Sequence, residues 1–320
     1  MSEERQNSGF DQKQVVGTGL VALDRIHIGS SRMAFEELGG SCGNVLISLA
    51  MLGRPVAPLL RLGSDLVGGK LERDLRCAGA DMRWVSRSQD VLSPVIVELL
   101  DPSSRTHQFL FSCPDSAEKF GRFQSITPSE LEPARPVLAN CRIFYADRLS
   151  ETICDAMEAA AAGGAIIHFE PSRVGDPDLF ARALAAAHIF KFSADRLAPI
   201  TAAQLRPDGF SIVTNGSIGL ELHHRGKTYN CAAAAADVVV DTCGAGDMVT
   251  LGLIDTVLQS GTDGPASLDV RTVLAGIKAG QRLAAANCAH VGARGLFRER
   301  GTAHVRSILT GDASATQPAN

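Results

Sequence analysis

The stretch DTCGAGD, Asp241 to Asp247, decides how this chain is expected to fold. It lies between the apolar run AADVVV and the apolar segment MVTLGLIDTVL, so we expect a turn from a strand into a helix. Glycine adopts backbone angles that other residues avoid, and Gly244 and Gly246 therefore let consecutive N–H groups point in one direction. Together with the positive end of the helix dipole, these amides are predicted to form an anion pocket.

An acidic residue in the first turn of the expected helix gives this pocket a chemical use. Asp247 would hold a carboxylate beside the anion pocket. Phosphoryl transfer to a hydroxyl needs both groups, because the amides stabilise charge on the phosphoryl group while the carboxylate orients the hydroxyl and accepts its proton. An ordinary Asp, with a pKa of about 4, is a weak base, but the proton moves late in a loose transition state, so position matters more than basicity. A purely structural interpretation also stands, since a glycine turn and an acid at a helix N-terminus are common.

The composition is that of a globular protein that handles small molecules. The 320 residues are 45% apolar, which is enough for one large α/β core. A formal net charge of -4 and the absence of a Lys/Arg-rich block give no basis for binding nucleic acid or an anionic membrane. No uncharged apolar run reaches the roughly 18 residues of a membrane span, and the polar start MSEERQNSGFDQ is unlike a signal peptide. The eight cysteines show no zinc-ligand spacing, so we expect reduced thiols and a cytoplasmic protein.

Hydrophobic patterning predicts one α/β unit over residues 15–310, with a polar tail before it (1–14) and a disordered tail after it (311–320). After Ala117 the chain alternates strand and helix patterns, which is typical of a mostly parallel, doubly wound sheet with helices on both faces. Nearer the N-terminus, alternating runs indicate a small β-sheet that covers the larger unit as a lid. The expected elements outside the repeated units are a first strand over 14–23, lid strands near 26–38 and 93–113, a helix over 43–53, a strand over 228–240, and helices over 245–260 and 268–288.

The longer pattern around the quoted stretch favours a functional interpretation. Six specified positions in seven arise by chance in a chain of this length with a probability on the order of 10⁻⁵. DTCGAGD resembles the C-terminal signature of the ribokinase-like (PfkB) carbohydrate kinases, and ELGGSCGNVLISLAMLG resembles the N-terminal signature of the same family. Further similarity runs through RLGSDLVGGKLERDLRCAGAD, IFKFSADRL, IVTNGSIGLEL and NCAHVGARGL, so the resemblance covers roughly residues 15–300.

The resemblance implies a doubly wound α/β domain with a β-sheet lid, and an enzyme that phosphorylates a hydroxyl of a small carbohydrate with ATP. It implies that Asp247 is the catalytic base, with an anion hole made by the amides of Gly244, Ala245 and Gly246. The positions that the family uses to hold the substrate's hydroxyls correspond here to Asp24, Gly39, Gly40 and Asn44.

The same resemblance implies a nucleotide site. The nucleotide-binding turn corresponds to Thr214, Gly216 and Gly219. The adenine pocket, and a neighbouring loop that can hold a monovalent cation such as K⁺, correspond to Asn287, Gly292 and Ala293. Many relatives also dimerise through the lid, which implies a homodimer here.

One position departs from the family pattern. Where the family has a Glu that helps to arrange Mg²⁺ through water, this chain has Arg196, although Ser193 three residues earlier matches. Asp195 is a candidate replacement, so Ser193 and Asp195 are the predicted metal residues. Three alternatives stay open for Arg196, namely a direct phosphate contact, a slow enzyme, and a solvated helix residue.

Several other signals compete with this interpretation. Gly17, Gly19 and Ala22 match the G-x-G-x-x-A dinucleotide fingerprint, but the following residues continue as a strand where that fingerprint needs a helix. No P-loop sequence is present. His168 suggests a catalytic role with Glu170, although a histidine at a strand end is more often structural.

Two alternative functions remain at this stage. A nucleoside kinase would use the same machinery and would need the lid aromatics Phe35, Phe109 and Phe111 to form two faces of a base slot. A phosphorylated sugar would instead need cations in the pocket, for which the lid offers Arg32, Arg105 and His107. The third hypothesis, of a different class, is a kinase-like sensor that has lost turnover, as suggested by Arg196.

Overall fold

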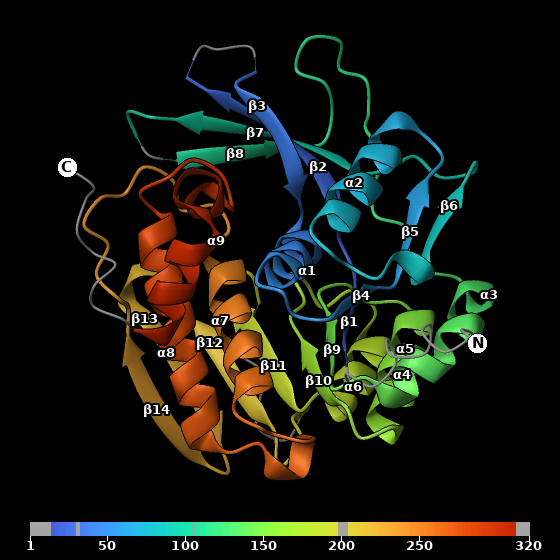
Figure 1. The fold of residues 1–320 in the computed structure, drawn as a ribbon, viewed down its shortest axis with the longest axis vertical. Helices are drawn as coiled ribbons and strands as arrows, with labels where there is room; N and C mark the ends of the chain where they lie inside the picture. Colours follow the sequence, from blue (N-terminus) through green and yellow to red (C-terminus); the bar gives the residue numbers. More distant parts are fainter. Residues whose placement is uncertain (1–13, 30–32, 105, 198–203, 312–320) are drawn as a thin grey trace, which may run out of the picture.

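The structure is a computed structural model that describes residues 14–29, 33–104, 106–197 and 204–311. Its centre is an eight-stranded sheet with the order β14-β13-β12-β11-β10-β9-β1-β4 (Figure 1). Pairing is parallel from β4 through β1, β9, β10 and β11 to β12, and antiparallel for β13 and β14 at the edge. The strands are β1 (Val15–Thr18), β4 (Val56–Pro58), β9 (Ile143–Ala146), β10 (Ile166–Phe169), β11 (Ile189–Ser193), β12 (Phe210–Thr214), β13 (Gly219–His224) and β14 (Lys227–Ala232).

Two hydrophobic cores lie on the two faces of this sheet. Successive residues of a strand point to opposite faces, so Tyr145 of β9 belongs to one core and Phe144 to the other. The first core is covered by α1 (Ser41–Met51), α2 (Leu66–Cys77), α7 (Ala245–Gln259), α8 (Val270–Asn287) and α9 (Gly295–Thr310). The second is covered by α3 (Pro128–Leu131), α4 (Arg135–Asn140), α5 (Glu151–Ala162) and α6 (Pro177–Ala186). The predicted doubly wound, mostly parallel α/β fold is confirmed. Within the described ranges, no helix has the length and apolarity needed to cross a membrane.

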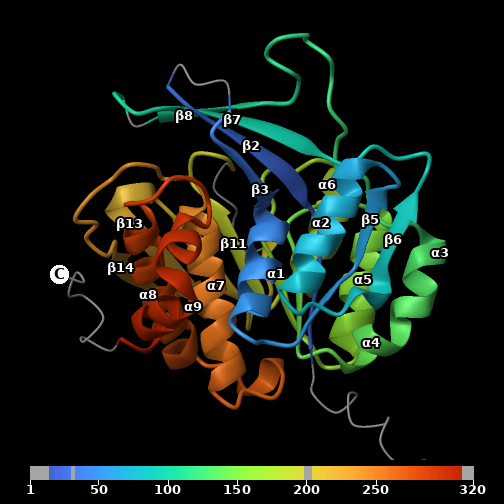
Figure 2. The ribbon, with the colours of Figure 1, turned by 45° about the horizontal axis from the view of Figure 1, so that its top comes forward.

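A four-stranded sheet lies over one end of the central sheet (Figure 2). Its order is β3-β2-β7-β8, with β2 parallel to β7 and the outer pairs antiparallel. The strands are β2 (Ala22–Ile28), β3 (Phe35–Gly39), β7 (Val95–Asp101) and β8 (Thr106–Leu110). We call this sheet the lid. A separate two-stranded parallel sheet is formed by β5 (Leu60–Gly63) and β6 (Val85–Ser88).

The strand order reverses beside β1, because the chain leaves β1 toward β4 on one side and returns through β9 on the other. Open α/β sheets bind ligands at such a switch point, at the carboxyl ends of the strands. Here Asp147, directly after β9, accepts hydrogen bonds from the amide of Leu20 at 2.9 Å and from that of Cys42 at 3.3 Å. One buried carboxylate thus joins the ends of β1 and β9 to the start of α1.

The prediction of a single strand over 14–23 is wrong, because the first part of this segment belongs to the central sheet and the last part to the lid. β1 ends at Thr18 and the lid begins at Ala22. The division occurs at Gly19, whose φ is +144° and where a Cβ would lie 1.7 Å from the carboxylate of Asp147. No helix opens at this point, so the dinucleotide fingerprint is excluded as expected.

Two further differences lie near the C-terminus. Strand β14 ends at Ala232, and residues 233–244 approach the DTCGAGD turn as irregular chain, so the strand predicted to continue to Val240 is wrong. Within this stretch the carboxylate of Asp241 accepts hydrogen bonds from the backbone amides of Cys243 and Gly292. These bonds take the place of those that a sheet would supply. Helix α9 was not predicted, and its Gly301 has a non-helical φ of +76° that interrupts the pattern. Most of the two predicted tails, 1–13 and 312–320, lies outside the described residues.

Candidate active site

The DTCGAGD turn leads directly into α7. Gly244 caps this helix with a left-handed φ of +72°, and a Cβ there would lie 2.5 Å from the Cβ of Ala293. A glycine is therefore required both by the backbone and by the close approach of the 287–294 loop. The amides of Gly244, Gly246 and Asp247 donate no hydrogen bond to a described residue, whereas the amide of Ala245 donates to the carbonyl of Thr242 at 3.2 Å and closes the turn. Unpaired amides at a helix N-terminus form a binding site for an anion.

Asp247 lies in the first turn of α7, beside these amides. Its Oδ2 accepts a 2.8 Å hydrogen bond from the side-chain nitrogen of Asn44, on the opposing helix α1. Burial, followed by the nearby carboxylate of Glu170, raises the pKa of Asp247 to about 7, while Asn44 and Lys191 oppose this shift. The sequence-based assumption of an ordinary Asp is therefore wrong, because a carboxylate with a pKa near neutrality is a competent general base.

A buried polar network supports the turn from behind, and the sequence reasoning missed its central residue. Lys191 on β11 is only 2% exposed, pairs with the carboxylate of Glu170, and donates to the carbonyl of Gly246 at 3.1 Å. Glu170 also accepts a 2.5 Å hydrogen bond from the hydroxyl of Thr250 on α7. The signal was a lysine inside the apolar strand IFKFS, since a buried cation needs a partner.

The predicted substrate residues lie where the lid meets α1. Asp24 is buried in β2, and burial followed by the nearby carboxylates of Glu98 and Glu37 raises its pKa well above the usual range. Gly39, its neighbour on β3, leaves room for this carboxylate, because a Cβ there would lie 1.7 Å from Oδ2 of Asp24. Gly40 has a φ of +78° and starts α1, the helix that carries Asn44.

Pairing in the lid shows which side chains share a face. Ile26 pairs with Glu98, and Leu100 pairs with His107, so Asp24, Glu98 and His107 lie on the same face of the lid. The oxygen Oδ1 of Asp24 and the oxygen Oε1 of Glu98 have no hydrogen-bond partner among the described residues. This face therefore offers unpaired carboxylate oxygens, which are acceptors for sugar hydroxyls.

The residues expected at the nucleotide lie in two loops, one after β12 and one after α8. Thr214 ends β12, and Gly216 and Gly219 continue from it with φ values of +55° and +120°. Asn287 is fully buried, and its side chain donates to the carbonyl of Gly292 at 3.2 Å and accepts from the amide of Leu296 at 3.0 Å. Because these bonds are all to backbone, Asn287 holds the shape of the 287–294 loop.

The residues expected to hold a metal lie at the end of β11. Ser193 pairs with Thr214 across the sheet, and its hydroxyl donates to the carboxylate of Asp195. Asp195 and Arg196 are exposed in the following turn, so Arg196 is solvated, as one alternative expected, but the expected helix is wrong. Two of the lid cations considered above, Arg32 and Arg105, lie outside the described residues.

His168 is a core residue. It is fully buried in β10, and both ring nitrogens lack hydrogen-bond partners within the described ranges. Burial, followed by the charge of Lys191, lowers its pKa to about 3, so the ring stays neutral near pH 7. Its ring packs edge-on against Tyr145 with centroids 5.4 Å apart.

Comparison with known proteins agrees with this fold and site. The profile described as "pfkB family carbohydrate kinase" matches residues 34–298. A fructokinase from Klebsiella pneumoniae is 29% identical over 259 residues, which is 74% of this chain and 81% of that protein. An ATP-dependent ribose-1-phosphate kinase from Halopiger xanaduensis is 28% identical over 240 residues, covering 72% of this chain and 77% of that protein.

Solved structures show the same fold. The aminoimidazole riboside kinase from Salmonella enterica, complexed with aminoimidazole riboside and an ATP analog, has a TM-score of 0.71 at 20% identity, covering 92% of this chain and 99% of that one. A turn with unpaired amides beside a half-buried carboxylate, in a doubly wound sheet, is an arrangement compatible with phosphoryl transfer. The chain belongs to the pfkB family of carbohydrate kinases. It is accordingly a sugar kinase that uses ATP.

Proposed function

We propose that this kinase phosphorylates a hydroxyl of a small, uncharged carbohydrate, with Asp247 as the general base and the N-terminal turn of α7 as the anion hole. The observation that carries the proposal is the position of Asp247. Its carboxylate is oriented by Asn44 at 2.8 Å and stands next to unpaired amides of the same helix turn. A hydroxyl placed between this carboxylate and the amides is positioned for attack on a phosphoryl group.

The reaction follows from these contacts. Asn44 occupies Oδ2 of Asp247, which leaves Oδ1 to accept the hydroxyl of the acceptor. As the new O–P bond forms and the bond from the γ-phosphorus to ADP breaks, the hydroxyl proton passes to Asp247. The amides of Gly244 and Gly246 donate hydrogen bonds to the transferring phosphoryl group and stabilise its negative charge. The buried ammonium of Lys191 stabilises the ionised carboxylate and fixes the turn through the carbonyl of Gly246.

The nucleotide side of the proposal rests on the two loops beside the turn. We assign ATP to these two loops, with Thr214, Gly216 and Gly219 on one and Gly292 and Ala293 on the other. Ser193 and Asp195 fit Mg²⁺, because hydroxyl and carboxylate oxygens are the ligands that this ion prefers. When bound, Mg²⁺ neutralises charge on the phosphate groups.

An uncharged acceptor is favoured by the charges at the acceptor end of the site. Asp24, Glu37 and Glu98 bring carboxylates there. The neighbouring cation Arg294 is already used, since it donates to the carbonyl of Leu38 and lies 3.8 Å from Glu37. These groups suit the hydroxyls of an uncharged sugar, whereas a phosphate would need a cation and Arg294 is already paired.

A sugar is also favoured over a nucleoside by the order of the lid strands. Phe35 is on β3 and Phe109 on β8, the two edges of the four-stranded lid. Three strand spacings separate these edges by roughly 14 Å, which is about twice the width of a slot that stacks one base between two rings. Phe35 is moreover covered by the guanidinium of Arg298, 4.2 Å from the ring centroid.

The experiment is ADP release with Mg-ATP and a panel of pentoses, hexoses, keto-deoxy acids, sugar phosphates and nucleosides. We expect an uncharged sugar to be the best acceptor, and Asp247→Ala to lower its kcat at least about 10²-fold while ATP binding changes little. Asp178→Ala, an exposed acid on α6, is the matched control and should retain activity. Activity of Asp247→Ala near the unsubstituted level would contradict the proposed base. ATP binding without turnover of any acceptor would favour the sensor.

A further inference from the structure

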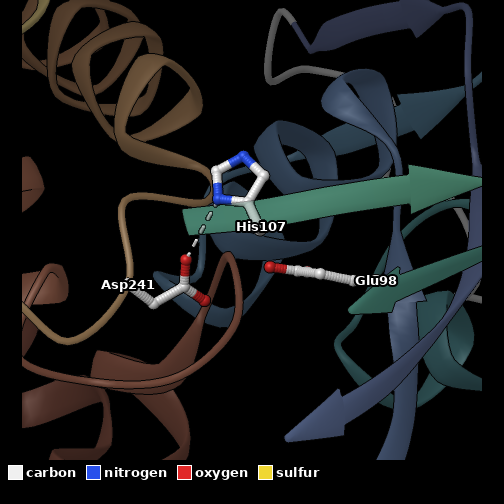
Figure 3. A group of neighbouring side chains, drawn as sticks. All are labelled: Glu98, His107 and Asp241. Carbon is white, nitrogen blue, oxygen red and sulfur yellow. Dashed lines mark ion pairs between the residues drawn. The ribbon is translucent and has the colours of Figure 1, made fainter. Parts of the chain in front are cut away.

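Three side chains from separate segments converge between the lid and the DTCGAGD turn. Glu98 comes from β7, His107 from β8, and Asp241 from the loop that precedes α7, and their side chains point toward one another (Figure 3). One ligand atom of each lies within 4.8 Å of the others. None of these three side chains takes part in the proton or phosphoryl transfer proposed above, although Glu98 is one of the carboxylates at the acceptor end of the site.

Contacts within the cluster leave some of its polar atoms without a hydrogen-bond partner among the described residues. Nδ1 of His107 lies 3.6 Å from Oδ1 of Asp241, which is longer than a hydrogen bond. Neither this nitrogen nor Oε1 of Glu98 has a hydrogen-bond partner among the described residues. Glu98 is 1% exposed and Asp241 is fully buried. Buried carboxylates of this kind are costly unless a cation compensates them.

The spacing of His107 and Asp241 suits a shared metal ion, and side-chain movements of about half an ångström would bring donors up to 4.8 Å apart within the roughly 4.2 Å that two metal–ligand bonds span. With metal–ligand bonds of about 2.1 Å, two donor atoms 3.6 Å apart subtend roughly 118° at the ion, which is close to tetrahedral. Asp241 is already held in place, because each of its two oxygens accepts a 2.8 Å hydrogen bond from a backbone amide, one from Cys243 and the other from Gly292. Support of this kind orients the ligands of protein metal sites.

We propose that Glu98, His107 and Asp241 form a site for a divalent transition-metal ion such as Zn²⁺, separate from the Mg²⁺ that accompanies ATP. One imidazole and two carboxylates are a donor set that suits Zn²⁺ and leaves a fourth position for water. Two ligands belong to the lid and one to the loop in front of the anion turn. Binding of the ion therefore holds the lid against the loop in the position described here and slows their separation.

The first measurement is calorimetric titration of Zn²⁺ into the full chain, treated with chelator, without nucleotide or sugar and with Mg²⁺ in excess. We expect one ion to bind per chain, and the affinity to fall at least tenfold in Glu98→Gln and in His107→Gln. His107 is partly exposed, so its substitution is tolerated by the fold. The matched control is His223→Gln, which removes an exposed histidine paired with Glu221 at 3.1 Å and should leave the affinity unchanged. Equal affinity in all the variants, or no stoichiometric binding, overturns the site.

Co²⁺ substitution distinguishes the proposed ligands from the cysteines. Visible absorption of a four-coordinate Co²⁺ site without a thiolate charge-transfer band is expected, and a thiolate band that survives in His107→Gln would assign the ion to cysteine instead. Hydrogen exchange then tests the effect on the lid. Zn²⁺ should slow exchange of the β7–β8 hairpin in the unsubstituted chain but not in His107→Gln, and unchanged exchange would overturn the effect of the ion on the position of the lid.

Discussion

At the scale of single residues, the site depends on ionisable side chains that are shielded from solvent, namely Asp247, Glu170 and Lys191. Asp247 forms no ion pair with a described residue, and its pKa is near 7 because burial and Glu170 disfavour the charged form. Lys191 limits this shift from behind the turn. The base is thus strong enough to accept a proton near neutral pH and still ionised for part of the time.

The pH dependence of turnover follows from this pKa. Asp247 works only when deprotonated, and its folded-state pKa is about 7, so kcat/KM for the acceptor should rise tenfold per pH unit below about 7 and level off above it. A coupled ADP assay between pH 5 and 9 measures the profile, with buffer controls at constant ionic strength. An acid limb near pH 4 would instead indicate an ordinary carboxylate.

Lys191→Met should shift the pH at which kcat/KM begins to fall on the acid side of the profile, called here the acid limb. Removing the ammonium leaves Glu170 unpaired beside Asp247, so the pKa of Asp247 rises and the acid limb shifts to higher pH. We expect a shift of about one unit and a lower kcat at pH 7. The matched control is the double variant Lys191→Met, Glu170→Gln, which removes both charges and should return the limb toward its original position. A purely structural role for Lys191 would lower stability without moving the profile.

At the scale of elements, the start of α7 is where local sequence and tertiary contact meet. The pattern predicted a helix over 245–260, and α7 runs Ala245–Gln259, because a left-handed glycine followed by an apolar run specifies a helix start locally. The irregular approach over 233–244 was missed, since its valines have the composition of a strand. These residues are held by contacts to the 287–294 loop, such as the amide of Gly292 on Asp241.

Gly244→Ala tests this element. The new Cβ would lie 2.5 Å from the Cβ of Ala293 and would need a left-handed backbone, so the turn must shift. We expect kcat to fall about 10²-fold or more, with weaker ATP binding, because the amides lose their alignment. Gly175→Ala is the matched control, since Gly175 also has a positive φ (+68°) but a Cβ there meets no atom within 4 Å. Equal activity of the two variants would show that the turn tolerates the displacement.

At the scale of the whole molecule, side chains far apart in sequence fasten the helices to one another. The chain leaves α1 through Gly53, which has a left-handed backbone. The next residue, Arg54, donates to the buried carboxylate of Asp255 on α7 at 2.6 Å. Asp255 also accepts a 2.5 Å hydrogen bond from Gln259. The pair holds together the two helices that carry Asn44 and Asp247.

Arg54→Met should therefore destabilise the fold more than it affects the chemistry. Asp255 is 1% exposed and would be left without its cation, which costs about 2 to 3 kcal/mol once the partial exposure of Arg54 is considered. Denaturant unfolding measures the loss, and kcat at low temperature should change less than threefold. The variant Arg54→Met, Asp255→Leu should recover most of the stability. Loss of activity without loss of stability would contradict this assignment.

The sequence by itself determined the fold class, the family and the position of α7, because these depend on short patterns: apolar periodicity, glycines at fixed spacing, and a motif of seven residues. Only the tertiary structure decided the division of 14–23 between two sheets, the raised pKa of Asp247, and the meeting of Glu98, His107 and Asp241. Asn44 and Asp247 are 203 residues apart, and their hydrogen bond leaves no periodic trace in the sequence. Polar contacts of this kind arise from the packing of whole elements, which local patterns do not encode.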